Sequence, residues 1–116
     1  MTETESSTFT PAQLELWRRI QSHPLEAPEQ GTDFTRRLAH DQGWSLIYAR
    51  RAVQEYRRYC FLSCLIATPL TPSADVDEVW HLHLIHSRDY WERFCSAVLE
   101  QPLHHAPTRG GRSELA

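Results

Sequence analysis

Residues 75–86 read DVDEVWHLHLIH, and the way this stretch folds decides the architecture expected of the whole chain. As a strand, it would alternate apolar residues with His81 and His83 and place both histidines on one face. As a helix, it begins with acids that suit the positive end of the helix dipole, with Asp75 as the expected N-cap and Glu78 as its capping-box partner. This capping pattern and the helical character of the flanking segments favour the helix.

The helical choice separates the histidines of this stretch. His81 and His83 then lie about 200° apart around the axis, so a regular helix cannot direct both at one ion. Asp77 and His81 share a face at i,i+4, whereas His83 shares another with His86. Two candidate sites stay open: Asp77 and His81 completed by the C-terminal tail, or His83 and His86 completed by a distant residue. A lone histidine on an apolar face is usually a hydrogen-bonded core residue, a role that suits His83.

A metal site is the function that these residues favour. We expect a divalent metal, zinc, bound by Asp77 and His81 with His104 or His105, because imidazole and carboxylate are suitable zinc ligands. His83 is expected to orient these ligands or to serve as an alternative one. A coordination position left open would permit hydrolytic chemistry through a bound water. No reaction follows, because no nucleophile motif, phosphate loop or complete ligand set is written in order, and whether the protein is an enzyme stays open.

Four further helices are expected around the central one. Each is bounded by a capping or helix-ending residue: Thr10 to His23, Thr32 or Asp33 to Gly43, Ser45 to Ala67, and Ser87 to Pro102. His23 is expected to act at a helix end and not as a ligand. A Pro-rich loop at residues 68–73 precedes the His-rich helix. The expected fold is an all-α, single-domain bundle of about five helices over residues 10–103, with a disordered N-terminus at 1–9 and a His/Pro/Gly tail at 104–116.

Apolar spacing predicts which helix faces are buried. Leu14 should line the inner face of the first helix, and Trp91 should begin an aromatic stripe in the last one. Residues 61–67 are apolar nearly all round, so this end of the longest helix is expected to be the most buried part of the protein. The three cysteines fall in the same apolar patterns and are expected to be reduced core residues: Cys60, Cys64 and Cys95.

Composition bounds the class of protein. The chain has 116 residues, is 41% hydrophobic and has a formal net charge of -3. Arginines cluster in residues 32–60, but the acidic balance and the lack of a nucleic-acid motif favour a solvated helix face over nucleic-acid binding. No apolar run is long enough to span a bilayer, and the acidic start MTETE is unlike a secretory signal. We therefore expect a cytoplasmic protein with no membrane partner.

Several motifs follow one another along the chain: PSADVDEVWHLH at residues 72–83, Tyr90 with Trp91, Cys95, and PLHH at residues 102–105. This pattern resembles the core of the glycine-rich domain-containing proteins, a family defined largely by a domain of unknown function. The likeness covers residues 32–111 and is carried mainly by the DVDxxWHxH string. It implies a mostly helical domain and no established activity. His86 stands where relatives are expected to have an aromatic or other residue, which argues against a site built on His83 and His86.

A second hypothesis is a non-catalytic interaction module whose aromatic and histidine surface receives a protein partner. It predicts that Trp80 or Trp91 is partly exposed within an apolar patch, because monomers rarely leave large patches of this kind open. A metal site needs converging ligands, whereas an interaction module needs an open aromatic surface. The oligomeric state and the identity of the partner do not follow from the sequence.

Overall fold

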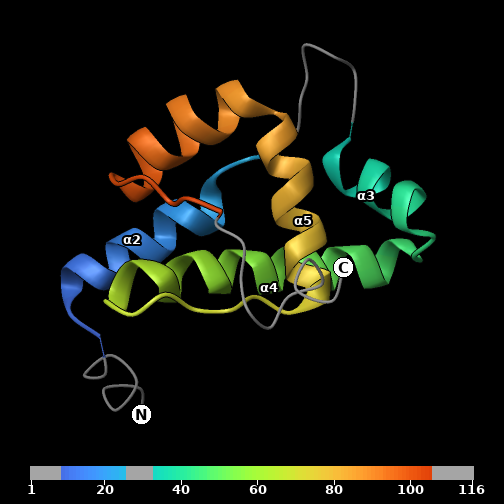
Figure 1. The fold of residues 1–116 in the computed structure, drawn as a ribbon. Coiled ribbons are helices and arrows are strands. Elements are labelled where there is room, and N and C mark those ends of the chain that lie inside the picture. The colour runs from blue at the N-terminus through green and yellow to red at the C-terminus, as the bar shows by residue number, and fades with distance from the viewer. Residues whose placement is uncertain (1–8, 26–32, 106–116) are drawn as a thin grey trace.

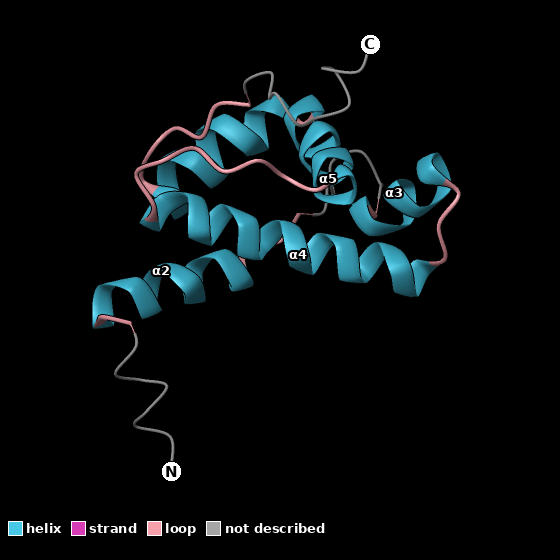
Figure 2. Cartoon of the chain, turned by 60° about the horizontal axis from the view of Figure 1, so that its bottom comes forward, coloured by secondary structure: helices cyan, strands magenta, loops and turns pink. Residues whose placement is uncertain are grey.

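Five helices build the part of the chain that the structure, a computed structural model, describes: residues 9–25 and 33–105. They are α2 (Pro11–Ser22), α3 (Phe34–Gln42), α4 (Leu46–Leu65), α5 (Ala74–Ile85) and η2 (Arg88–Leu99). Figure 2 shows no strand in these ranges, which confirms the predicted all-α fold. None of the five helices is both long and apolar enough to cross a bilayer. The predicted N-terminal disorder up to residue 8 and the tail beyond residue 105 lie outside the described residues.

The longest helix, α4, is the support on which the others pack. It contacts α2, α3 and α5, and η2 packs against α2 and α5. Figure 1 shows α5 crossing α4, α3 lying by one end of α4, and η2 in orange near α2. The core is therefore formed around α4, α5 and η2, and its fully buried large side chains include Tyr56, Val79, Tyr90 and Phe94.

Side-chain caps start the first three helices where the sequence predicts them. The Thr10 amide donates to Gln13 Oε1 at 2.9 Å and the Gln13 amide donates to Thr10 Oγ1 at 3.0 Å, which completes a capping box. Asp33 caps α3 and Ser45 caps α4 by accepting hydrogen bonds from first-turn amides. Gly43 ends α3 at φ 72°, a left-handed conformation that favours glycine.

The start of α5 differs from the prediction. Ser73 is the N-cap, and its hydroxyl accepts a hydrogen bond from a first-turn amide at 3.1 Å. The predicted capping box of Asp75 and Glu78 is therefore wrong. Ser73 still has extended backbone, whereas Asp75 already lies in the first turn, where its carboxylate accepts a hydrogen bond from the Tyr48 hydroxyl. Glu78 accepts one from the Gln42 side chain at 3.2 Å, which ties α5 to α3.

The last helix is a π-helix, in which i→i+5 hydrogen bonds make a wider turn than in an α-helix. The wider turn places residues four and five apart on the buried face: Tyr90, Phe94, Cys95, Val98 and Leu99. Trp91, the predicted start of the buried stripe, is displaced from that face and is 37% exposed. Ser87 has a helical conformation and makes no side-chain cap, contrary to the prediction.

The core lies nearer the middle of α4 than the sequence predicts. The buried residues of α4 run from Ala49 to Phe61, whereas Leu62 and Ile66 are exposed. The end of this helix carries more apolar side chains than one packing face can cover. Trp17 of α2 packs on the Phe61 ring at a centroid distance of 5.2 Å, and the side of the helix away from that contact stays open.

Helix α2 does not bury Leu14 as predicted, and Leu16 and Trp17 pack against the core instead. Leu14 is exposed, and Ile20 is the fully buried residue of this helix. The contacts of α2 with the core lie toward its C-terminal end, where the Arg19 side chain donates to the backbone carbonyl of Val98 in η2 at 3.0 Å. The first turn of α2 therefore contributes a cap and little core packing.

Candidate metal centre

One predicted group of metal ligands comes together beside α5. Asp77 and His81 project from successive turns of this helix, and His105 reaches them from the segment that follows η2. His105 Nε2 lies 2.5 Å from Asp77 Oδ1, and His81 Nε2 lies 3.8 Å from Asp77 Oδ2. One ligand atom from each residue lies within 4.8 Å of the other two. We call these three residues the outer group.

Aromatic contacts hold His105 in the outer group. Its ring packs against that of Trp80 at a centroid distance of 4.4 Å and against that of His81 at 4.6 Å. The Trp80 indole donates to the Tyr90 hydroxyl at 2.8 Å, and Tyr90 in turn donates to the backbone carbonyl of Leu103. These hydrogen bonds fix the chain two residues before His105. The outer group therefore depends on the packing of α5 against η2.

The outer group is open to solvent on one side. The side chains of Asp77 and His105 are 18% and 17% exposed, whereas that of His81 is 50% exposed. Water can consequently reach the group from the His81 side. One carboxylate and two imidazoles suit zinc and other first-row divalent metals. Among the described residues, the outer group is thus a partly open set of side chains that could hold a metal.

Two of the five predicted ligands lie elsewhere. The His104 ring packs on Trp91 at a centroid distance of 5.3 Å and does not join the outer group. His83 points into the core, because residues two apart in a helix face nearly opposite directions. His86, the predicted alternative partner of His83, instead turns Nδ1 toward the Leu82 backbone carbonyl at 3.0 Å. The structure therefore separates His83 from the ligands that the sequence groups with it.

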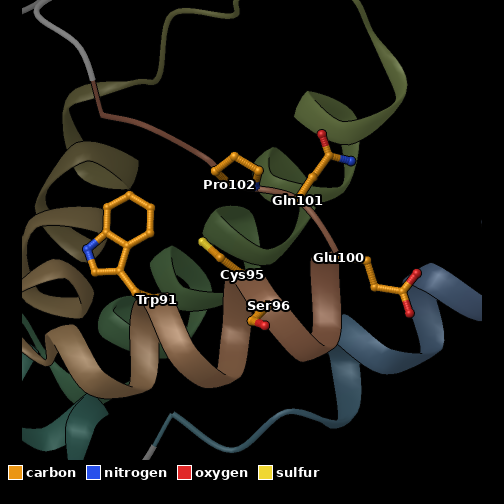
Figure 3. Close-up of a pocket in the computed structure, with 6 residues that line it drawn as sticks. All are labelled: Trp91, Cys95, Ser96, Glu100, Gln101 and Pro102. Carbon is orange, nitrogen blue, oxygen red and sulfur yellow. The ribbon is translucent and has the colours of Figure 1, made fainter.

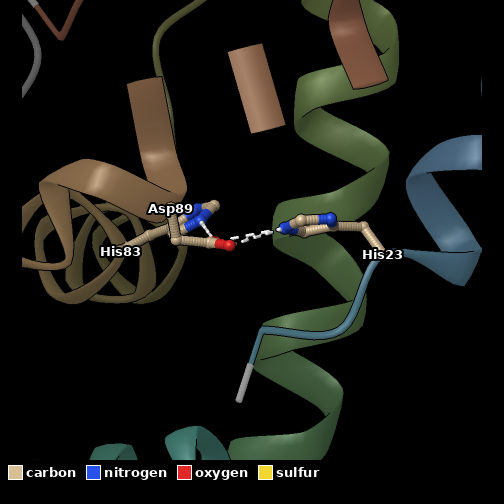
Figure 4. A group of neighbouring side chains, drawn as sticks. All are labelled: His23, His83 and Asp89. Carbon is tan, nitrogen blue, oxygen red and sulfur yellow. Dashed lines mark hydrogen bonds and ion pairs between the residues drawn. The ribbon is translucent and has the colours of Figure 1, made fainter. Parts of the chain in front are cut away.

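A second group of side chains that could hold a metal lies inside the protein (Figure 4). We call His23, His83 and Asp89 the inner group; they come from the end of α2, from α5 and from the first turn of η2. Asp89 Oδ2 lies 2.7 Å from His83 Nε2 and 3.1 Å from His23 Nε2. The side chain of His23 is 9% exposed, that of His83 is 1% exposed and that of Asp89 is 12% exposed. On the other edge of the His83 ring, Nδ1 lies 2.6 Å from the Tyr56 hydroxyl oxygen.

The inner group shifts the pKa values of Asp89 and His83. Burial alone would raise the pKa of Asp89, but hydrogen bonds from His23 and His83 outweigh burial and hold that pKa well below its usual range. Burial lowers the pKa of His83, although the Asp89 carboxylate opposes the change. The group is therefore an ionised carboxylate between two imidazoles, one of which is fully buried.

Sequence reasoning does not find the inner group. His23 is the C-cap of α2, as predicted, yet its ring also reaches Asp89, which is 66 residues away in sequence. Asp89 follows His83 by six residues, a spacing that a regular helix does not place on one face. The chain brings them together because α5 ends and the next helix starts between them. No local pattern signals this contact.

A surface pocket of about 350 Å³ lies along η2 (Figure 3). It is lined by Trp91, Cys95, Ser96, Glu100, Gln101 and Pro102. Burial raises the pKa of the Cys95 thiol, so this sulfur is a weak nucleophile. Trp91 provides the aromatic wall of the pocket, whereas Trp80 is buried. The partly exposed tryptophan that the second hypothesis predicts is therefore Trp91.

Comparison with known proteins adds no relative. No family model, curated protein or solved structure matches this chain. The resemblance to the glycine-rich domain-containing proteins therefore stays a prediction. The two groups of histidines and aspartates are accordingly the basis on which a function can be proposed.

Proposed function

We propose that this chain is a helical metal-binding domain that holds a zinc ion at the outer group. The observation that carries the proposal is the convergence of Asp77 and His81 with His105, which lies 28 residues from Asp77 in sequence. A carboxylate and two imidazoles form a ligand set that zinc uses when it keeps a fourth position for water. The half-exposed side of His81 is where that position would lie.

The distances in the outer group suit such an ion after small movements. Zinc binds nitrogen and oxygen ligands at about 2.0–2.2 Å, so two ligand atoms at a tetrahedral angle lie about 3.3 Å apart. The His105–Asp77 distance of 2.5 Å must lengthen, and the His81–Asp77 distance of 3.8 Å must shorten. Side-chain rotation is sufficient for changes of this size, and the exposure of His81 leaves its ring room to turn.

A role without metal explains less of the arrangement. The hydrogen bond between Asp77 and His105 needs no third residue, and a partly exposed i,i+4 pair such as Asp77 with His81 contributes only about 0.3–0.5 kcal/mol. Two imidazoles nevertheless approach one carboxylate with their rings 4.6 Å apart. A cation bound to both rings and to the carboxylate would hold these three side chains together. We assign no reaction to the site.

Metal titration of the untagged, metal-free chain tests the proposal. His81→Ala and His105→Ala should each remove one equivalent of bound Zn²⁺ relative to the parent, measured by calorimetry and elemental analysis. His104→Ala is the matched control, because its ring is adjacent in sequence but packs on Trp91. Equal zinc binding by the parent and by His105→Ala would overturn the proposal.

Hydrogen exchange gives an independent measure of the same site. Because His105 joins the end of the described chain to α5, bound Zn²⁺ should slow exchange of the amides at residues 104 and 105. The protection should disappear with chelator and in His81→Ala, which leaves the hydrogen bond between Asp77 and His105 in place. Exchange that is the same with and without Zn²⁺ would show that no ion fastens this segment.

One observation favours a second candidate function, a non-catalytic interaction module. Trp91 is partly exposed at the surface pocket and packs with His104, which gives the aromatic and histidine surface that such a module needs. Trp91→Phe should remove the most readily quenched part of the tryptophan fluorescence, because Trp91 is exposed whereas Trp17 and Trp44 are half-buried and Trp80 is buried. Equal acrylamide quenching of parent and variant would count against an open aromatic surface.

A further inference from the structure

The interior of the protein contains a second set of converging ligand atoms, those of the inner group. His23 and His83 both direct Nε2 at the same oxygen of Asp89, at 3.1 and 2.7 Å. Figure 4 shows the carboxylate placed between the two rings. We propose that the inner group is a second metal site, a structural one, that binds a divalent ion of the zinc type and fastens the end of α2, α5 and η2 together. This inference does not rest on the outer group.

Tyr56 orients His83 for metal binding. When one ring nitrogen of a histidine binds a metal, the other nitrogen carries the proton and donates a hydrogen bond to an oxygen acceptor. This hydrogen bond fixes the ring. His83 Nδ1 lies 2.6 Å from the Tyr56 hydroxyl oxygen. Tyr56 is fully buried, and its oxygen can accept a hydrogen bond from Nδ1. Without an ion, the same distance suits a hydrogen bond in the opposite direction, from the Tyr56 hydroxyl to Nδ1. The ring is therefore held in the orientation that a ligand needs in either state.

The charge of Asp89 supplies a reason for a cation. A carboxylate that is only 12% exposed needs compensation, because desolvation of a charge is costly. Arg93 approaches Asp89 Oδ1 at 3.7 Å, but its side chain is largely exposed, and a pair of this kind is weak. The two imidazoles supply hydrogen bonds to the carboxylate. A divalent ion among these three ligands would compensate the carboxylate directly.

Aromatic rings enclose His83 and limit what can enter the inner group. Tyr90 and Phe94 each lie at a centroid distance of 5.0 Å from the His83 ring, and Phe34 lies at 6.1 Å. Phe94 also contacts the His23 ring at 5.3 Å. This packing leaves no room for a large ligand beside His83, so the proposed occupant is a single ion. Because these rings exclude larger molecules, the role proposed for an ion here is to fasten the three helix segments that supply its ligands.

Insertion of an ion requires the inner group to open slightly. The His83–Asp89 distance of 2.7 Å must approach the separation of about 3.3 Å expected for two tetrahedral zinc ligands. Asp89 can supply this movement, because it lies in the first turn of η2, directly after the bend at His86. The His23–Asp89 distance of 3.1 Å is already close to that value.

The test uses the full chain with His81→Ala and His105→Ala together, so that the outer group cannot bind an ion. After removal of metal, this background should bind one equivalent of Zn²⁺ in calorimetry, and Co²⁺ should give the visible absorption of a tetrahedral site. Adding Asp89→Asn or His23→Gln should abolish that binding. Asp75→Asn is the control, because this carboxylate lies in the first turn of α5, as Asp89 lies in the first turn of η2, but belongs to neither group.

Two further measurements separate coordination from folding. Each variant is first shown to be folded in chelator by its far-ultraviolet spectrum, and His23→Gln stands in if Asp89→Asn does not fold. Tyr56→Phe in the same background should keep the ligands but weaken Zn²⁺ binding by about 10–100-fold. A background that binds no Zn²⁺, or binds it equally well with and without Asp89→Asn and His23→Gln, would refute the inner site. The outer site is judged separately, by His105→Ala in the parent chain.

Discussion

The buried hydroxyl of Tyr56 offers the sharpest test of how the core is held together. Tyr56→Phe removes one oxygen and keeps the ring, which is nearly parallel to Phe94 with their centroids 6.3 Å apart. The change leaves His83 Nδ1 without its partner in a fully buried position. Burial raises the pKa of Tyr56 well above its ordinary value, so the hydroxyl keeps its proton and stays available as a donor.

The expected loss follows from the cost of an unsatisfied buried polar group. In chelator, Tyr56→Phe should lower the free energy of unfolding by about 1–3 kcal/mol. For a domain of this size each kcal/mol lowers Tm by about 4–8 °C. Urea unfolding should show a lower midpoint with an unchanged m-value, because the surface exposed on unfolding is nearly the same.

The control for this measurement is Tyr48→Phe. The Tyr48 hydroxyl also donates to a partner, the Asp75 carboxylate, but the residue is exposed, so its loss should change stability by less than about 0.5 kcal/mol. The comparison isolates burial as the cause. A Tyr56→Phe protein as stable as Tyr48→Phe would refute the view that the Tyr56–His83 contact is a buried hydrogen bond that the fold requires.

Three other predictions follow from single features of the structure. The hydrogen bonds of Asp89 with His23 and His83 outweigh the effect of burial and keep the folded-state pKa of Asp89 below its unfolded value of about 3.9. Asp89 therefore stabilises the fold at pH values above the unfolded pKa, and this stabilisation declines as the pH falls further. Urea unfolding in chelator should therefore show a steeper loss of stability from about pH 5 to about pH 3 in the parent than in Asp89→Asn; parallel curves would contradict this. Burial raises the pKa of the Cys64 thiol to about 11, so iodoacetamide at neutral pH should label it at least about 100-fold more slowly than a solvated cysteine, and mass spectrometry that finds equal rates would refute the shift. Gly43→Ala should cost about 1–2 kcal/mol through its positive φ alone, because no atom lies within 4 Å of an added Cβ; unchanged urea stability would contradict that cause.

Local signals explain which parts of the fold could be predicted. Thr10, Asp33 and Ser45 cap helices with backbone amides two or three residues away, so the sequence contains all that these helix starts require. Ser73 and Asp75 can both accept such bonds, and the predicted cap at Asp75 is wrong. Ser73 precedes Asp75 and takes the extended backbone that a cap needs.

Features that depend on distant contacts could not be predicted in the same way. The i,i+4 pairing of Asp77 with His81 follows from helix geometry, but the choice of His105 over His104 depends on where Tyr90 holds the chain at Leu103. The amphipathic pattern of the last helix is compatible with an α-helix and with a π-helix, and the two differ in the number of residues in a turn. The pattern therefore predicts a buried stripe in this helix, but the stripe begins at Tyr90 and not at the predicted Trp91.

The position of α5 gives the histidines of one short stretch two different environments. His81 and His83 are separated by one residue, yet His81 belongs to a partly open group with Asp77 and His83 to an enclosed group with Asp89. A strand would have placed both rings on one face and merged the groups, whereas a helix must divide them. The same helical geometry that buries His83 among aromatic rings therefore leaves His81 half exposed, so an ion at the outer group would be open to solvent and one at the inner group would be enclosed.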